Sequence, residues 1–165
     1  MTHGEQRVTP SEFRTLIGSF ASGVSVITAT DGNGRATGMT ATAVTAVSLD
    51  PPLISVCVNN SDPLHTIMRG ATIFAVNILA EGQVTMSRRF AGEHALRFHE
   101  VAYTEGLHGV PLLDSVVAQI LCKPWKEIEA GDHSMFLGLV TAGSVFERLP
   151  LLHYRGRYGT TRDLA

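Results

Sequence analysis

The sequence predicts a mainly β fold with short helices, arranged as a closed or partly open antiparallel barrel. Many short stretches alternate apolar and polar residues with a period of two, which is typical of half-buried strands. Few stretches have helical spacing, and they do not alternate with the strands as βαβ units would. The 165 residues fit one domain, residues 1–165, in which residues 1–10 are expected to form a flexible N-terminal segment.

Composition argues against several classes of protein. The formal net charge of −2 disfavours nucleic-acid binding, which usually needs a basic stripe. No apolar run approaches the roughly 20 residues of a membrane span, and the polar first residues lack the apolar core of a signal peptide. We therefore expect a cytoplasmic protein without membrane contact. Cys57 and Cys122 lack C-x-x-C spacing and fit small buried hydrophobes. The seven histidines are scattered, so we predict no metal site.

The first helix is predicted from a capping box, in which Thr9 caps the helix, Pro10 takes its first position and Glu12 reaches back. Apolar residues then follow at helical spacing: Phe13, Leu16, Ile17 and Phe20. Gly23 is expected to end the helix. This predicted helix buries its apolar stripe.

Strands are predicted through most of the remaining chain. Residues 24–30 form one, and the Asp-Gly-Asn-Gly of residues 31–34 is a strong hairpin turn. The almost continuously apolar residues 73–79 are expected in the centre of the sheet. The other predicted strands are 35–49, broken by the Asp-Pro-Pro of 50–52, then 53–59, 116–122, 125–128, 134–140, 144–146 and, as a last candidate, 154–158. Helices are predicted at 62–70 and 81–90, and residues 91–110 are loop-rich.

Residues 38–49 carry small side chains for a strand, which normally prefers Val, Ile or an aromatic residue. The small ones are Thr40, Ala41, Thr42, Ala43 and Ala46. They leave space beside the backbone, where a flat polycyclic ligand could take hydrogen bonds from main-chain groups and hydroxyls. The alternative, which the spacing alone favours, is tight packing of a helix on the strand or the taper of a barrel.

The Asn-Asn-Ser-Asp-Pro of residues 59–63 ends a strand and begins a helix. Free backbone N–H groups there, with Ser61, form an anion site. Plain N-capping by Ser61 or Asp62 is the alternative, and Asp62 repels a phosphate unless it points away. Arg88 and Arg89 either complete a phosphate clamp or form a solvated helix face.

Gly131, Asp132 and His133 precede a strongly apolar strand. A histidine at the start of a strand, beside a carboxylate, can present its imidazole to a cleft. The alternative is an ordinary turn, because Gly-Asp is common turn chemistry.

Taken together and in this order, these segments resemble the short-chain flavin reductase family. The most specific are the Ser-Leu-Asp-Pro-Pro of residues 48–52 and the Gly-Asp-His of residues 131–133. The others are residues 13–28, 38–40, 74–79, 109–113 and 150–156, with Ser87, Arg89 and Phe90. The resemblance spans residues 11–158.

The resemblance implies an FMN-binding split β-barrel of Greek-key type, assembled as a homodimer with flavin sites near the subunit interface. It also implies FMN or FAD bound without covalent attachment, and NADH or NADPH as hydride donor. No basic cluster is clearly dedicated to a 2′-phosphate, which favours NADH. Members often serve as the reductase component of two-component monooxygenases, so a partner monooxygenase reached by diffusing reduced flavin is expected.

The resemblance also implies roles for particular residues. Those expected along the flavin are Met39, Thr40, Ala41, Thr42, Ala43, Val47 and Ser48. Those expected at its ribityl and phosphate region are Cys57, Val58, Asn59 and Ser61, with Arg89 and Phe90 by the phosphate or ring. His133, Asp132 and Tyr158 are expected at the nicotinamide. Because hydride passes directly between the two rings, His133 would position the nicotinamide and abstract no proton.

One departure from the family concerns Thr42 and Ala43, where the family often has Asn-Ser. The side chain of Ala43 donates no hydrogen bond, so the choice between FMN and FAD stays open. Two alternative functions also remain at this point. One is a flavoprotein on the same barrel that retains its flavin, such as a ferric reductase or another electron-transfer protein. The other is a non-enzymatic flavin-binding module.

Overall fold

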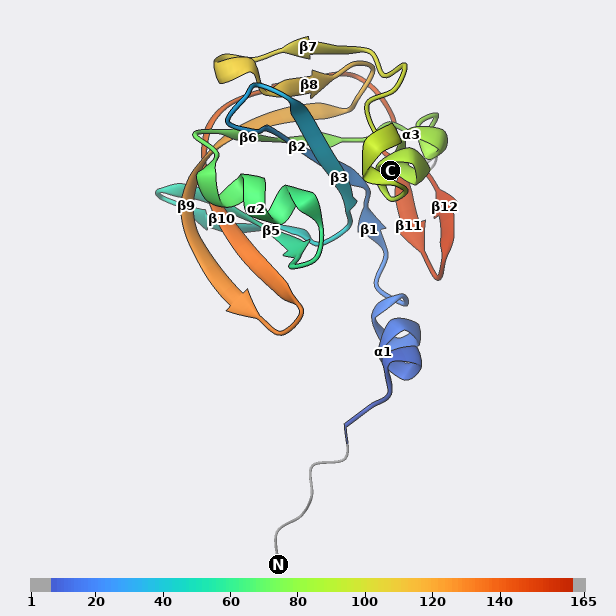
Figure 1. The fold of residues 1–165 in the computed structure, drawn as a ribbon. Helices are drawn as coiled ribbons and strands as arrows, with labels where there is room; N and C mark the ends of the chain where they lie inside the picture. The colour runs from blue at the N-terminus through green and yellow to red at the C-terminus, as the bar shows by residue number, and fades with distance from the viewer. Residues whose placement is uncertain (1–6, 162–165) are drawn as a thin grey trace, which may run out of the picture.

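The computed structural model describes residues 7–161, which form a mainly β structure (Figure 1). The largest sheet has seven antiparallel strands in the order β3-β2-β6-β9-β10-β5-β4. These strands are β2 (Ser25–Thr30), β3 (Ala36–Ala41), β4 (Val44–Leu49), β5 (Pro52–Asn59), β6 (Phe74–Ile78), β9 (Ala118–Ala130) and β10 (His133–Val145). Two small sheets combine β1 (Ser22–Gly23) with β11 (Leu152–Tyr154) and β12 (Arg157–Gly159), and β7 (Tyr103–Glu105) with β8 (Pro111–Leu113). The helices are α1 (Pro10–Ile17), α2 (Pro63–Gly70) and α3 (Val84–Phe90), with 3₁₀ turns η1 (His94–Leu96) and η2 (Leu107–Gly109).

The large sheet closes on itself because its two edge strands are consecutive in the sequence. β3 and β4 lie at opposite edges of the sheet, yet only Thr42 and Ala43 separate them. The Cα atoms on either side of a two-residue link lie at most about 11 Å apart, so the edges must approach each other. No ladder joins the two edges among the described residues. The predicted antiparallel barrel is confirmed, and it is a split barrel.

The expectation of one strand-like segment at residues 35–49 is wrong. β3 pairs with β2, whereas β4 pairs with β5, so the chain changes sides of the barrel at Thr42 and Ala43. Small side chains on both sides of this point conceal the change, because they give no contrast between apolar and polar positions. The hairpin turn at residues 31–34, strand β5, helix α2 and the interior position of β6 agree with the sequence analysis.

β9 and β10 are continuous strands of 13 residues each, where the sequence analysis expected four shorter ones. Register shifts between Leu137 and Gly138, and between Val140 and Ala142, interrupt the alternation of apolar residues without ending the strands. A Cβ on Gly138 would lie 2.4 Å from the ring of Phe74. Only glycine fits at this position, since the ring of Phe74 fills the space. Two other ranges also differ: the helix expected from residue 81 begins at Val84, and residues 154–158 belong to a hairpin.

The core of the barrel lies between the sheet and α2. Leu64 and Met68 of α2 pack against Val56, Val58 and Phe136. The two cysteines are free, as expected, with Cys122 fully buried and Cys57 half-buried. Burial raises the pKa of the Cys122 thiol to about 12 and also raises the pKa of Cys57.

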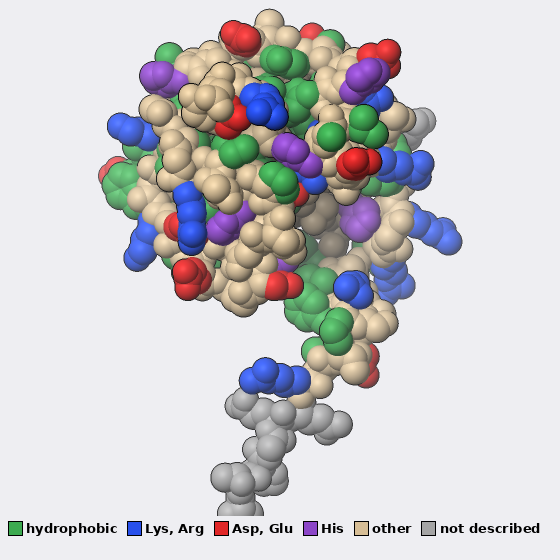
Figure 2. Space-filling view, in the orientation of Figure 1, with side chains coloured by type: hydrophobic (Ala, Val, Ile, Leu, Met, Phe, Trp, Pro, Cys, Tyr) green, Lys and Arg blue, Asp and Glu red, His purple; other side chains and the backbone are tan. Residues whose placement is uncertain are grey.

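Helix α1 has the predicted capping box, which fixes Thr9 to Glu12, but it buries nothing. Its apolar residues are exposed, Phe13 by 56%, Leu16 by 64% and Ile17 by 55%, and so is Phe20 just after the helix, by 74%. The helix ends at Ile17 and not near Gly23: after Gly18, the N–H groups of Ser19 and Phe20 bond three residues back, to the carbonyls of Leu16 and Ile17, and no longer four. Figure 1 shows α1 standing away from the barrel, and Figure 2 shows hydrophobic side chains open on the segment below the barrel. We call Phe13, Leu16, Ile17 and Phe20 the α1 stripe. Residues 1–6 of the expected flexible segment lie outside the described residues.

A polar cluster, buried at His65 and Ser134 and open at Arg69, ties α2 to the β9–β10 hairpin. The Nε2 atom of His65 lies 2.8 Å from the hydroxyl of Ser134, which donates to Glu127 Oε1 at 3.0 Å. Arg69 donates to both oxygens of Glu127 at 2.8–2.9 Å. A serine beside a histidine can be a nucleophile. Ser134, however, is only 1% exposed, so no substrate reaches it and the cluster is structural.

Glu127→Gln should therefore lower stability at neutral pH, and the loss should disappear in acid. Hydrogen bonds from Arg69 hold the pKa of Glu127 below its ordinary value of 4.5. The ionised carboxylate thus stabilises the folded state above that value, and this stabilisation is lost as the pH falls through the lower folded-state pKa. Urea unfolding of both proteins from about pH 7 to pH 3 measures the difference. Glu129→Gln, which changes a side chain that is 86% exposed, is the control and should have little effect at any pH. A constant loss across the pH range would contradict the assignment.

Candidate functional site

Strand β5 brings several of the predicted residues into one row. The Cys57 N–H donates to the carbonyl of Ala43 at 3.2 Å, and Asn59 lies opposite His133 in the β5–β10 ladder. Because side chains alternate along a strand, Cys57 and Asn59 share one face of the sheet. Val58, between them, points to the core and is fully buried. Ala43, Cys57, Asn59 and His133 therefore form one continuous corner, whereas the side chain of Val58 cannot contact a ligand.

His133 is both a turn residue and an exposed imidazole. Gly131 has a φ of +67°, which suits the tight turn between β9 and β10. His133 Nδ1 lies 2.7 Å from Asp132 Oδ1, and its side chain is 41% exposed. The hydrogen bond with His133 lowers the pKa of Asp132. The carboxylate thus orients the ring and leaves Nε2 available on the surface.

At residues 59–62 the capping interpretation holds for Asp62, whose carboxylate accepts from the Leu64 N–H at 2.9 Å. Asn59 Oδ1 accepts from the backbone N–H and the hydroxyl of Ser61, at 2.8 and 2.6 Å. Ser61 itself is exposed. This turn, residues 59–62, holds a hydroxyl at the start of α2, and we call it the α2 corner.

On the other side of β3, helix α3 lies close to the small residues. A Cβ on Gly38 would lie 2.7 Å from the Ile27 carbonyl and 3.1 Å from the ring of Phe90. The Thr40 hydroxyl donates to the Ser87 carbonyl at 2.6 Å, and Ala41 is 6% exposed in the core. Tight packing thus explains residues 38–41, and space for a ligand begins at Thr42 and Ala43, both of which are exposed.

The two remaining residues of α3 are engaged within the protein. Phe90 is fully buried and meets Phe98 edge to face at 5.0 Å, so its ring is not available to a flavin. The guanidinium of Arg89 donates to the carbonyl of His99. Arg89 is half-buried, so part of its side chain is open to solvent. The ring of Phe90, expected beside the flavin, packs in the core instead.

Tyr158 does not join His133. Its hydroxyl lies 3.0 Å from the hydroxyl of Ser87, and the guanidinium of Arg88 lies 5.8 Å from its ring centre. Figure 1 places β12, which carries Tyr158, on a different side of the molecule from the β9–β10 turn. The expected nicotinamide set is therefore divided within one chain: Asp132 and His133 lie together, and Tyr158 lies with α3.

A cavity of about 1240 Å³ opens beside Thr42 and Ala43. Its walls come from the barrel split, from α1 and from the β11 hairpin, and include Thr42, Ala43, Val44, Thr45, Arg14, Ile78, His153 and Arg155. It is larger than the ~300–1,000 Å³ of most small-molecule sites. The sequence analysis did not name Arg14 and His153 as site residues. Both are far in sequence from Thr42 and Ala43, and no local pattern indicates that the fold brings them to the same cavity.

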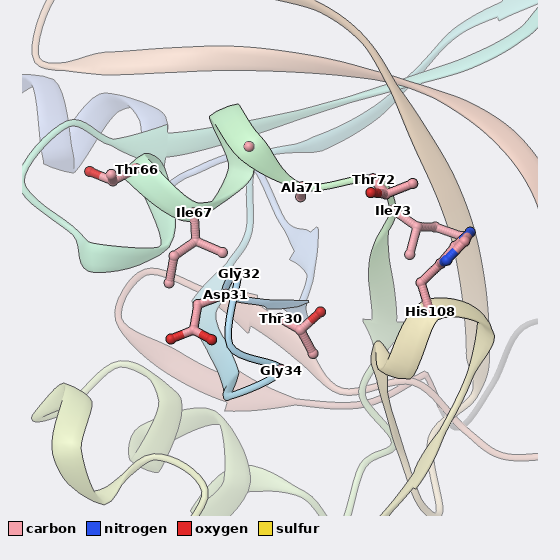
Figure 3. Close-up of a pocket in the computed structure, with 11 residues that line it drawn as sticks. Thr30, Asp31, Gly32, Gly34, Thr66, Ile67, Ala71, Thr72, Ile73 and His108 are labelled. Atoms are coloured by element: carbon pink, nitrogen blue, oxygen red, sulfur yellow. The ribbon is translucent and has the colours of Figure 1, made fainter.

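A second cavity of about 570 Å³ lies between the β2–β3 turn and the end of α2. Figure 3 shows Thr72 and His108 at one side of it and Asp31 and Ile67 at the other. The carboxylate of Asp31 accepts from the N–H groups of Asn33 and Arg35 in its own turn. None of the predicted site residues lines this cavity, so it is separate from the candidate site.

Strand β4 gives the site polar groups of its own. It is an edge strand of the large sheet, so the backbone N–H and C=O groups on its outer side are available to a ligand. Val47 is 49% exposed and Ser48 is half-buried. A flat ring with a polar edge fits such a strand, because main-chain groups can pair with that edge while small side chains leave room for the ring. The residues present therefore fit a flavin.

The described residues contain no group of three or more His, Cys, Asp or Glu side chains that could hold a metal ion. None of the helices that the structure describes is long and apolar enough to cross a membrane.

Comparison with known proteins gives one consistent result. The model of the flavin reductase like domain matches residues 17–162. A probable flavin reductase of Rhizobium meliloti (strain 1021) is 40% identical over 93% of this chain and 49% of its own length. The reductase component of 4-nitrophenol 4-monooxygenase/4-nitrocatechol 2-monooxygenase from Rhodococcus opacus is 36% identical over 93% of this chain and 82% of its own.

Solved structures agree. The NADH:FAD oxidoreductase SgcE6 of Streptomyces globisporus C-1027, in complex with NAD and FAD fragments, superposes with a TM-score of 0.86 at 33% identity. The match covers 97% of each chain. By contrast, this chain spans about half the length of the Rhizobium meliloti relative. The family match covers most of the chain and includes the corner formed by Ala43, Cys57, Asn59 and His133, and the chain therefore belongs to the flavin reductase like domain family.

Proposed function

We propose that this chain is an NAD(P)H-dependent flavin reductase that transfers hydride from NADH, and less readily from NADPH, to FMN or FAD. The reduced flavin would then leave and supply a partner monooxygenase. The observation that carries the proposal is the open link at Thr42 and Ala43, beside an edge strand, a large cavity and an exposed histidine. Its similarity to a probable flavin reductase and to the reductase component of a monooxygenase supports it.

The flavin would lie along the split of the barrel. Thr42 and Ala43, with the outer backbone of β4 at Val47 and Ser48, offer the open surface that the ring needs. Backbone donors there would stabilise the negative charge that grows on the flavin when it is reduced. Hydride transfer itself needs stacked rings at short distance and little acid–base chemistry from the protein.

The α2 corner would hold the flavin phosphate. Ser61 is exposed next to the start of α2, and its hydroxyl, which donates to Asn59 Oδ1 in this structure, would turn to donate to the phosphate. Arg89 would add charge from α3. Met39, Thr40 and Ala41 would support the flavin surface at Thr42 and Ala43 through packing in β3 and through the hydrogen bond from Thr40 to Ser87. The ring of Phe90 would act in the same way, from the core.

His133 would position the nicotinamide. Its ring is oriented by Asp132 and lies opposite Asn59, so an exposed Nε2 can donate to or accept from the carboxamide or a phosphate. Tyr158 lies elsewhere in the chain and would contact the nicotinamide only if a second subunit brought it there.

The exposed α1 stripe supports a homodimer. An isolated helix of eight residues is not stable in water, and this chain covers none of its apolar side chains. Three exposed apolar residues on one short helix, with Phe20 just after it, call for a partner surface. A second copy of the chain would supply it, and α1 already borders the cavity next to Thr42.

Steady-state oxidation of NADH and of NADPH, each with FMN, FAD and riboflavin, tests the proposed activity. We expect turnover with free flavin in excess over protein, because the flavin is a substrate. A protein that stays yellow through gel filtration and reduces only its own flavin would be a flavoprotein of the retained type. A protein that binds flavin but does not bleach it on rapid mixing with NADH would be a carrier.

His133→Ala should raise the Michaelis constant for NADH and slow hydride transfer about ten-fold, which corresponds to about 1.4 kcal/mol for one positioning contact. Flavin affinity should stay within a few-fold of wild type, because the link at Thr42 and Ala43 is untouched. Melting temperature is measured on the same preparation. Unchanged NADH kinetics with a lower melting temperature would make His133 a structural turn residue and remove it from the site.

Leu16→Glu should convert the dimer into a monomer, because it places a charge in the middle of the α1 stripe. Sedimentation at micromolar concentration should give twice the chain mass of 17.7 kDa for wild type and the single mass for the variant. Thr104→Glu adds the same charge at another exposed position and should leave the dimer intact. A wild-type monomer with full activity would refute a shared site.

A further inference from the structure

Arg97 is a buried cation in the part of the chain that has the least sequence pattern. It follows η1, and its side chain is only 8% exposed. Its guanidinium donates to the carboxylate of Asp62 at 2.9 and 3.2 Å, to the carbonyl of Gly38 at 2.8 Å and to the carbonyl of Gly92 at 3.1 Å. One side chain thus makes four hydrogen bonds to three separate segments.

Two of these segments lie on opposite sides of the barrel split. Gly38 belongs to the edge strand β3, and Asp62 follows β5, which is next to the opposite edge. No ladder joins these strands in the described part of the chain, so Arg97 provides a polar connection where β-sheet hydrogen bonds are missing. A second connection comes from the same loop, where His94 Nε2 lies 2.9 Å from the hydroxyl of Thr37 on β3.

The charge of Arg97 also matters at the α2 corner. Asp62 lies next to Ser61, and an unpaired carboxylate there would repel a phosphate. The bidentate pair with Arg97 cancels that charge and turns the carboxylate toward the loop while its Oδ1 still caps α2. Because both partners are buried, with side-chain exposures of 8% and 14%, removing one leaves the other charge uncompensated.

We propose that Arg97 is a positioning residue for flavin recognition. It fixes the strand that leads to Thr42 and Ala43 relative to the α2 corner, and it neutralises Asp62 so that the corner accepts the flavin phosphate. This inference rests on the proposed function, which places that phosphate at the α2 corner.

The test compares FMN with riboflavin, which differ by the phosphate, in fluorescence titrations well below each protein's melting temperature. Arg97→Gln should weaken FMN binding about ten-fold or more, the scale of a charged contact, and riboflavin binding much less. Adding Asp62→Asn to this variant removes the uncompensated carboxylate, and the ratio of the two affinities should return toward wild type. Thr37→Val breaks the neighbouring connection to His94 without changing any charge and should leave the ratio unchanged.

Arg97→Lys covers the case in which Arg97→Gln does not fold. A lysine keeps the charge but cannot make the same four bonds, so both flavins should bind a few-fold more weakly with the ratio preserved. Equal losses for both flavins in Arg97→Gln, a ratio that the double variant fails to restore, or a ratio lost in Arg97→Lys would each overturn the inference. Equal affinity of the wild-type protein for FMN and riboflavin would instead refute the phosphate site itself.

Discussion

The structure depends on one covalent constraint, the two-residue link between the opposite edges of a seven-stranded sheet. Thr42 and Ala43 hold β3 and β4 within a short distance of each other, so the other strands must curve around a common interior. The sheet cannot flatten without breaking this link. β3 pairs only with β2 and β4 only with β5, and no ladder joins β3 to β4 among the described residues, so the barrel stays open beside the link.

The opening determines where chemistry is available. Along most of the barrel, main-chain groups are paired and side chains fill the interior, as Gly38 and Gly138 show by their lack of space for even a methyl group. At the split, an edge strand with free backbone groups lies next to small exposed side chains. A ligand that binds there can use the protein backbone for recognition.

Sequence reasoning was successful where the signal is local. The capping box at Thr9, the helix that starts after Asp62 and the alternation in β5 each depend on neighbouring residues. It failed where the cause lies far along the chain. Asp62, the ion-pair partner of Arg97, is 35 residues away in the sequence, and the residues around Arg97 show no pattern that predicts a buried cation. The register shifts in β10 and the position of Tyr158 depend on tertiary pairing that a period of two does not report. The helical spacing of the α1 stripe correctly predicted a helix, but the expected burial of the stripe within this chain was wrong. An amphipathic pattern does not say which surface covers the apolar face.

The raised thiol pKa values have a consequence for redox chemistry. Only the thiolate form of cysteine reacts readily with peroxides and disulfides. Burial raises the pKa of the Cys122 thiol to about 12. It also raises the pKa of Cys57, which lies in the row that includes Ala43 and Asn59. The thiol of Cys57 is therefore less readily ionised at neutral pH than that of an exposed cysteine. Under the proposed function, reduced flavin would thus form beside a thiol that is oxidised slowly.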